Sequence, residues 1–147
     1  MSTEIKKSTT TPEVMDCLVQ IFQAEMSGII RYLHYSFMIM GHHRIPIQNW
    51  FRSQAQESMT HATTVGEKIT SLGGHPPMVS ARVEETNVHS LDQILQESLG
   101  FETATLNLYK KLVRLAGDDI ALEEMAREFV RTETEHMDEV NKMLKIK

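Results

Sequence analysis

The sequence predicts an all-α protein, a four-helix bundle with one long crossover connection. Apolar residues recur every three or four positions over four long segments, and no segment shows the alternation of a half-buried strand. Glycine and proline number only 7 and 4 in 147 residues, which favours long helices over many turns. Two short connections and one long one separate the segments, an order that gives two antiparallel hairpins joined by a crossover.

The first predicted hairpin opens with a clear helix start. Thr11 suits the N-cap position and Pro12 the first helical position, so a helix should run from there to about Met40. Gly41 is a natural stop for this helix. After a short turn, a second helix is expected over residues 47–72, where a pair of glycines ends it.

The second predicted hairpin follows a connection over residues 73–89. Its glycines and prolines and its lack of helical periodicity mark a loop that is long for a compact domain. Such a loop can cross the whole length of a bundle and join two parallel helices. A capping box at Ser90 then starts a third helix that reaches about Ala116, and Asp118 is expected to cap a fourth helix that reaches about Leu144.

The composition excludes several classes of protein. A formal charge of −5 argues against a nucleic-acid-binding surface and fits a protein that tolerates cations. Cys17 is the single cysteine, which excludes an internal disulfide and a Cys-x-x-Cys metal site and fits a reducing compartment. No apolar run approaches the ~18–20 residues that span a bilayer, and the N-terminus lacks the apolar segment of a signal peptide.

These bounds give the expected setting of the protein. We expect a cytoplasmic protein with no nucleic-acid partner and no membrane partner. Residues 1–10 are polar and are expected to form a disordered tail, and the bundle is expected to occupy residues 11–147.

Each predicted helix carries acidic or histidine residues in the stripe that should face the core. The two halves repeat one pattern: a lone glutamate with a tyrosine seven residues on, then a glutamate about one turn before a histidine. The tyrosines, Tyr32 and Tyr109, could be core residues or partners of a carboxylate. Two such halves, related by a pseudo-twofold axis, would bring six groups to one level of the core. These candidate ligands are Glu25, Glu57, His61, Glu102, Glu133 and His136.

Charge explains why such groups would face inward. Four carboxylates buried together repel one another, and each costs several kcal/mol to desolvate. Two divalent cations balance their charge, and the two imidazoles give each metal one nitrogen ligand. Carboxylate with imidazole suits iron or manganese. Any one of these residues alone is more often found on a surface, but the matching set on four inward stripes predicts a dinuclear metal site.

These residues resemble bacterioferritin, within the wider ferritin-like family, over about Glu13 to Leu144. The motifs A-E-M-S-G-I-I-R-Y around Glu25, F-E-T-A-T-L around Glu102, and E-T-E-H ending at His136 carry the resemblance, with His61-Ala62 and the later L-G-G-H-P. The resemblance implies two iron ions per chain, with manganese as the alternative metal. It also implies that ferrous iron is oxidised by dioxygen or peroxide and passed to a mineral core in a cage of 24 subunits.

The resemblance also bears on haem and on assembly. Met59, two residues before His61, lies where bacterioferritins hold a haem iron across a twofold dimer interface. Small and apolar residues off the ligand stripes predict a subunit contact, and hence a homodimer or larger homo-oligomer. The predicted outer-face residues are Phe51, Ala55, Met59, Ala62 and Gly66 of the second helix, with Ala24, Gly28, Tyr35 and Met38 of the first.

Two features depart from the family pattern. Glu57 lies four residues before His61, and the family spacing is three. The register then needs a helix bulge, or another residue replaces Glu57. The sequence also ends at Lys147, just after the fourth predicted helix, so no counterpart is expected of the fifth helix that lines a symmetry axis of the bacterioferritin cage.

The predicted function is that of a bacterioferritin-like di-iron protein that oxidises ferrous iron for storage or detoxification. Glu25 and Glu102 would supply lone carboxylates, and Glu57 and Glu133, or Glu102, would bridge or terminally bind the two irons. Two alternatives stay open: a di-iron or di-manganese oxidoreductase that removes peroxide, and a non-enzymatic metal-binding bundle. Oxidant preference would identify the first alternative, and an absence of oxygen consumption the second.

Overall fold

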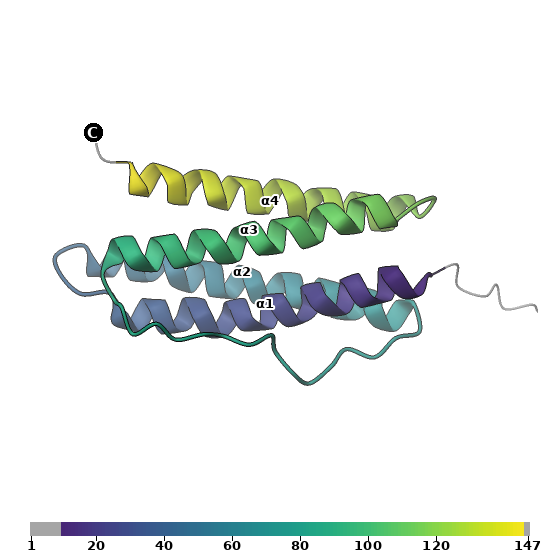
Figure 1. Ribbon diagram of the computed structural model, residues 1–147, viewed down its shortest axis with the longest axis horizontal. Coiled ribbons are helices and arrows are strands. Elements are labelled where there is room, and N and C mark those ends of the chain that lie inside the picture. Colours follow the sequence, from purple (N-terminus) through teal and green to yellow (C-terminus); the bar gives the residue numbers. More distant parts are fainter. Residues whose placement is uncertain (1–9, 146–147) are drawn as a thin grey trace, which may run out of the picture.

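The computed structural model describes residues 10–145, which form four helices and no strand (Figure 1). α1 packs against both α2 and α3, and α3 packs against α4. All four helices lie side by side along the long axis of the molecule (Figure 1). The predicted four-helix bundle is therefore confirmed. The elements are α1 (Pro12–Met38), α2 (Arg44–Ser71), α3 (Leu91–Leu115) and α4 (Ile120–Leu144).

Local capping explains where the first hairpin's helices begin. The Thr11 hydroxyl accepts a hydrogen bond from the backbone N–H of Val14 at 3.3 Å, and Pro12 is the first residue of α1, both as predicted. α2 begins at Arg44, earlier than the predicted residue 47. Pro46 therefore falls in the first turn of α2, where the backbone N–H groups have no helical partner and a proline is tolerated.

Some of the other helix ends differ from the prediction by one or two residues, although α4 ends at Leu144 as predicted. α1 ends at Met38, two residues before the predicted Met40. Asp119, and not Asp118, caps α4, because its carboxylate accepts a hydrogen bond from the backbone N–H of Leu122 at 3.1 Å. Gly117, with φ +57°, supplies the left-handed backbone of the turn before it.

The crossover between α2 and α3 runs the length of the bundle beside α1 (Figure 1). The backbone N–H of Ala81 donates a hydrogen bond to the carbonyl of Gln23 on α1 at 3.0 Å. Further along, the Thr86 hydroxyl donates to the carboxylate of Glu97 on α3. The crossover is thus fixed to two helices, and it makes α2 and α3 parallel, as predicted. The tail predicted over residues 1–10 lies, apart from Thr10, outside the described residues.

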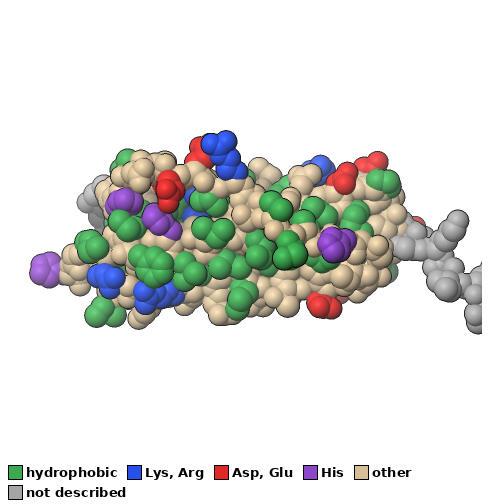
Figure 2. All heavy atoms as spheres, turned by 90° about the horizontal axis from the view of Figure 1, so that it is seen from below, with side chains coloured by type: hydrophobic (Ala, Val, Ile, Leu, Met, Phe, Trp, Pro, Cys, Tyr) green, Lys and Arg blue, Asp and Glu red, His purple; other side chains and the backbone are tan. Residues whose placement is uncertain are grey.

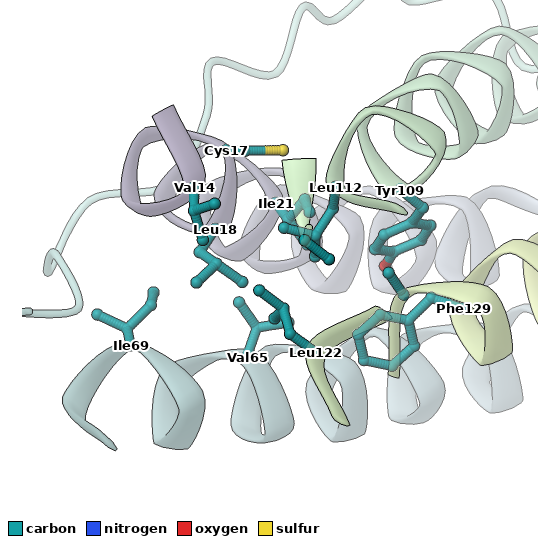
Figure 3. Close-up of a cluster of buried hydrophobic side chains, with 12 residues drawn as sticks. Val14, Cys17, Leu18, Ile21, Val65, Ile69, Tyr109, Leu112, Leu122 and Phe129 are labelled. Atoms are coloured by element: carbon teal, nitrogen blue, oxygen red, sulfur yellow. The ribbon is translucent and has the colours of Figure 1, made fainter. Parts of the chain in front are cut away.

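Two apolar clusters fill the bundle, one toward each end. The first, shown in Figure 3, joins the starts of α1 and α4 to the ends of α2 and α3. The second joins the opposite halves of the helices. Each helix therefore passes from one cluster to the other, and the six candidate ligands lie in between. Fully buried members include Leu18, Ile69, Leu112 and Leu122 in the first cluster and Tyr32, Phe51, Ile94 and Leu95 in the second.

The outer face of the first hairpin is only partly as predicted. Five residues expected on it are buried within the chain, because each helix of a bundle buries a stripe wider than the ligand positions alone. The buried residues are Gly28 and Tyr35 on α1 and Phe51, Ala55 and Ala62 on α2.

None of the described helices has the length and hydropathy that a membrane crossing requires.

The apolar stripe that is exposed on this side of the molecule shares only Met59 with the predicted outer face. Ile30, Leu33 and Phe37 follow one another at helical spacing along α1 and are 51%, 38% and 54% exposed. Met59 of α2 is 46% exposed. Figure 2 shows hydrophobic side chains gathered along the middle of the face seen from the side of α1 and the crossover. We call Ile30, Leu33, Phe37 and Met59 the α1–α2 apolar stripe.

Gly28 allows α1 to approach its neighbours closely. A Cβ atom at this position would lie 2.7 Å from Ser58 Oγ and 3.0 Å from Phe101 Cζ. We expect Gly28→Ala to lower the free energy of unfolding by ~1–3 kcal/mol in urea denaturation, since overpacking forces neighbours to shift. Gly100→Ala on α3 is the matched control, because nothing lies within 4 Å of its Cβ position. That variant should gain up to ~1 kcal/mol of stability. Equal effects at the two positions would contradict close packing at Gly28.

Candidate metal centre

Side chains from all four helices meet between the two apolar clusters. Glu25, His61 and Glu133 each offer one ligand atom, and these atoms lie within 4.8 Å of one another. Glu102, Glu133 and His136 form a second group within the same distance. Glu133 belongs to both groups. Two adjacent groups that share one carboxylate have the arrangement that a dinuclear metal centre requires.

The donor atoms of this centre are buried and only partly satisfied. Glu25, Glu102 and Glu133 are 1%, 2% and 4% exposed. Glu102 Oε2, Glu133 Oε2 and His136 Nδ1 are buried atoms without a hydrogen-bond partner. Such atoms are costly in a protein interior and call for an explanation. Because all three belong to the second ligand group, these residues fit a bound cation.

Each lone glutamate is held by a tyrosine from the other hairpin. The Tyr32 hydroxyl on α1 donates a hydrogen bond to Glu102 Oε1 on α3. The Tyr109 hydroxyl on α3 donates to Glu25 Oε1 on α1. The two bonds are equivalent, as the predicted pseudo-twofold relation requires. Both tyrosines are therefore partners of a carboxylate, and Tyr109 is also a member of the apolar cluster of Figure 3.

Both imidazoles present the same ring nitrogen to the centre. His61 Nδ1 lies 3.6 Å from Glu25 Oε1 and 3.8 Å from Glu133 Oε1. His136 Nδ1 lies 3.8 Å from Glu133 Oε2 and 4.0 Å from Glu102 Oε1. These separations exceed hydrogen-bond distances. The nitrogens and oxygens thus surround a common space and are not paired with one another.

Glu57 lies on the opposite side of both rings. Its Oε2 is 2.6 Å from His136 Nε2, and its Oε1 is 3.9 Å from His61 Nε2. Its side chain is 33% exposed, and it belongs to neither of the two ligand groups. The structure therefore brings together five of the six predicted ligands through Nδ1 and carboxylate oxygens, and it places the sixth at the rim.

Ser58 occupies the place that the internal repeat gives to a carboxylate. It lies three residues before His61, as Glu133 lies three residues before His136, and it is 5% exposed. The prediction missed this residue because it matched glutamate to glutamate. The spacing from each histidine was the signal that identifies Ser58 as the counterpart of Glu133.

The carboxyl groups of the centre bind protons more strongly than isolated ones. Burial raises the pKa of Glu102 to about 8. The charge of His136 opposes this rise, and the charge of Glu25 adds to it. Burial also raises the pKa of Glu133, although the nearby imidazole of His136, 3.8 Å away, works in the other direction. Both shifts arise because the charged form loses water without gaining a full counter-charge.

The pKa values of the two histidines are also raised, but here burial opposes the rise and the neighbouring carboxylates cause it. Burial lowers the pKa of His136, but the adjacent carboxylates of Glu133 and Glu57 outweigh it and raise the pKa to about 10. Burial likewise opposes the raised pKa of His61, and contact with Glu25 accounts for the rise. At neutral pH the metal-free centre therefore holds protons where a metal ion would bind, and metal binding should release them.

Met59 lies outside the centre, on the outer surface of α2, as predicted. It lines a shallow groove of about 270 Å³ together with Phe22, Met26 and Gly66. The groove is continuous with the α1–α2 apolar stripe through Met26, which lies one helical turn before Ile30 on α1.

Comparison with known sequences finds a matching family model and a distant curated relative. The family model of the ferritin-like domain matches residues 15–147. A curated relative from Nostoc sp. strain PCC 7120, described as a nutrient stress-induced DNA-binding protein, is 24% identical over 117 residues. That match covers 73% of this chain and 62% of the relative, so the chain spans less than two thirds of the relative's length.

Solved structures agree with this assignment. A ferritin-like di-iron carboxylate protein from Bacillus anthracis str. Ames matches with a TM-score of 0.86 and 26% identity, over 92% of this chain and 100% of that one. The dodecameric thioferritin of Bacteroides fragilis, a bacterioferritin-related protein, matches with a TM-score of 0.82 and 18% identity, over 89% of this chain and 83% of that one. Rhodobacter capsulatus bacterioferritin, with a metal-free dinuclear site and haem iron, matches with a TM-score of 0.81 and 18% identity, over 92% of this chain and 85% of that one. Because the family model covers nearly the whole chain, the chain belongs to the ferritin-like family.

Proposed function

We propose that this protein binds two ferrous ions in the centre and oxidises them, as a ferroxidase that serves iron storage or detoxification. One observation carries the proposal: two groups of buried ligand atoms share Glu133. Membership of the ferritin-like family supports it, as does the likeness to a di-iron carboxylate protein at 26% identity.

The roles of the residues follow from the two groups. Glu25 and His61 would hold one ion, Glu102 and His136 the other, and Glu133 would bridge them. Tyr32 and Tyr109 would fix the lone carboxylates through the hydrogen bonds described above. Carboxylate and imidazole ligands suit iron and also manganese, so manganese stays the alternative metal.

The reaction needs two electrons from the iron pair. Two ferrous ions, one dioxygen and two protons give two ferric ions and one hydrogen peroxide. With peroxide as oxidant, the same two electrons and two protons give two waters. The bundle would hold the two ferrous ions side by side, so that both electrons reach one oxidant, and its apolar clusters would limit water.

Anaerobic titration of the metal-free protein with ferrous iron, followed by air, tests the proposal. We expect binding to saturate near two irons per chain, and air should then produce a fast rise in ferric absorbance in the near ultraviolet. An absence of saturable binding would overturn the proposal. Binding without oxygen consumption would favour the non-enzymatic bundle, and faster turnover with peroxide than with dioxygen would favour the peroxide-removing oxidoreductase.

The proposal includes a homo-oligomer built through the α1–α2 apolar stripe. Exposed apolar residues at helical spacing are typical of a subunit contact, and one relative in the same fold is described as dodecameric. Haem held between two copies by their Met59 thioethers belongs to this proposal as well. Light scattering should give at least twice the 16.8 kDa of one chain, and Phe37→Glu should lower that mass. An unchanged mass in this variant would place the contact elsewhere.

The DNA binding that the name of the Nostoc relative states is outside this proposal. The net charge of −5 opposes contact with a phosphate backbone. Ferrous iron with dioxygen or peroxide is the partner set that the centre favours.

A further inference from the structure

We propose that Glu57 is a positioning residue that holds both metal-binding histidines, and that it does not bind metal itself. The inference rests on the proposed dinuclear centre and concerns how its two imidazoles are oriented. It removes one of the six residues from the predicted ligand set.

The first argument is which ring nitrogen Glu57 contacts. Both histidines direct Nδ1 to the shared space and Nε2 to Glu57, with Nε2 to carboxylate distances of 2.6 Å for His136 and 3.9 Å for His61. A histidine that binds metal through one nitrogen commonly donates its other N–H to a carboxylate, which fixes the ring and its tautomer. Glu57 would do this for His136 by a hydrogen bond and for His61 by a longer charge contact.

The second argument is the register of α2. A bulge in this helix would rotate Glu57 inward, but α2 is continuous α-helix from Arg44 to Ser71. One residue corresponds to about 100° of rotation about a helix. Ser58 therefore faces the interior beside Gly28, and Glu57 stays at the rim with a third of its side chain exposed.

The resulting ligand set differs in charge from the predicted one. Glu25, Glu102 and Glu133 carry −3 and two divalent ions carry +4, whereas a set with Glu57 would be neutral. Glu133 is then the sole protein carboxylate shared by both groups, and the α2 side of the centre offers the Ser58 hydroxyl. If Glu57 lies outside the ligand set, its substitution should leave the number of bound ions unchanged and should alter only how tightly they bind.

Cobalt(II) titration of the metal-free protein tests the inference without iron turnover. The variants are Glu57→Gln and Glu57→Ala, with Glu133→Gln as the comparison that loses a ligand. We expect two cobalt ions per chain in the wild type and in both Glu57 variants. Glu57→Ala should bind 10- to 100-fold more weakly, the usual effect of losing a carboxylate behind a metal-binding histidine. Glu57→Gln should recover most of that affinity, because the amide oxygen still accepts the Nε2–H hydrogen bond.

The outcomes separate this inference from the proposed function. If the wild type binds two cobalt ions but Glu57→Gln binds one, with a visible spectrum like that of Glu133→Gln, then Glu57 is a ligand and only the inference fails. If the wild type itself does not bind two ions, the dinuclear centre fails and the inference fails with it. Circular dichroism of each variant checks folding, and Glu57→Gln keeps the test decisive if Glu57→Ala does not fold.

Discussion

Glu133→Gln is expected to lower the initial rate of ferrous oxidation by at least ~100-fold. Its carboxylate is the one shared by both ligand groups, with oxygens 3.8 Å from the Nδ1 atoms of His61 and His136. Glutamine keeps the size of the side chain but removes the charge that, in the proposed centre, would bind the two ions. Oxidation that draws one electron from each ion depends on holding both at once, so losing the bridge costs more than losing a terminal ligand.

Stopped-flow absorbance after mixing the ferrous-loaded protein with oxygenated buffer measures this rate. Glu135→Gln is the matched control, because Glu135 lies two residues further along α4 and its side chain is 64% exposed. That control should oxidise iron at the wild-type rate. If Glu133→Gln kept more than half of the wild-type rate, Glu133 would not be the bridge.

The fold was predictable because its signals are long and repeated. The helical period extends over four segments of 25–28 residues, and helix starts such as Thr11 and Ser90 cap as predicted. The outer face was not predictable in the same way. Periodicity gives the direction of a buried stripe but not its width, and the width depends on how closely the helices approach. Gly28 is the example: the sequence predicts it on the outer face, and the structure places it where α1 packs against Ser58.

The centre shows the same limit at the scale of one residue. Positions three and four before a histidine both lie on its side of a helix. The sequence therefore placed Glu57 beside His61 but did not decide whether it faces Nδ1 or Nε2. That choice depends on where α4 places His136, which is a tertiary fact. By contrast, the tyrosines follow the internal repeat, and their pairing with the glutamates of the opposite hairpin follows from the pseudo-twofold packing.

The metal-free protein is expected to lose stability as pH rises from 5 to 9. The pKa of Glu102 is raised from 4.5 to about 8, so its contribution is fully present below pH 4.5 and is lost as pH rises through 8. The pKa of His136 is raised from 6.5 to about 10, so its contribution is fully present below pH 6.5 and is lost as pH rises through 10. Glu133 and His61, also raised, act with the same sign. The pKa of Glu57 is lowered from its ordinary value of 4.5, so its contribution to stability changes only at acidic pH, below 4.5.

Urea denaturation of chelator-treated protein at pH 5, 7 and 9 measures this loss. Each group that keeps a proton only in the folded state lowers the free energy of unfolding by up to about 1.4 kcal/mol per pH unit. Glu102 and His136 each do so over about two to three units of this range, so a total fall of several kcal/mol is expected. Glu102→Gln should flatten the curve between pH 5 and 8, because it removes the carboxyl whose burial sets that slope. Saturating zinc should reverse the slope, since metal and protons compete for the same atoms and deprotonation favours the metal. Stability that rises with pH in the metal-free protein would contradict this account, because it would show that the buried carboxylates are balanced by some charge other than a proton or a metal ion.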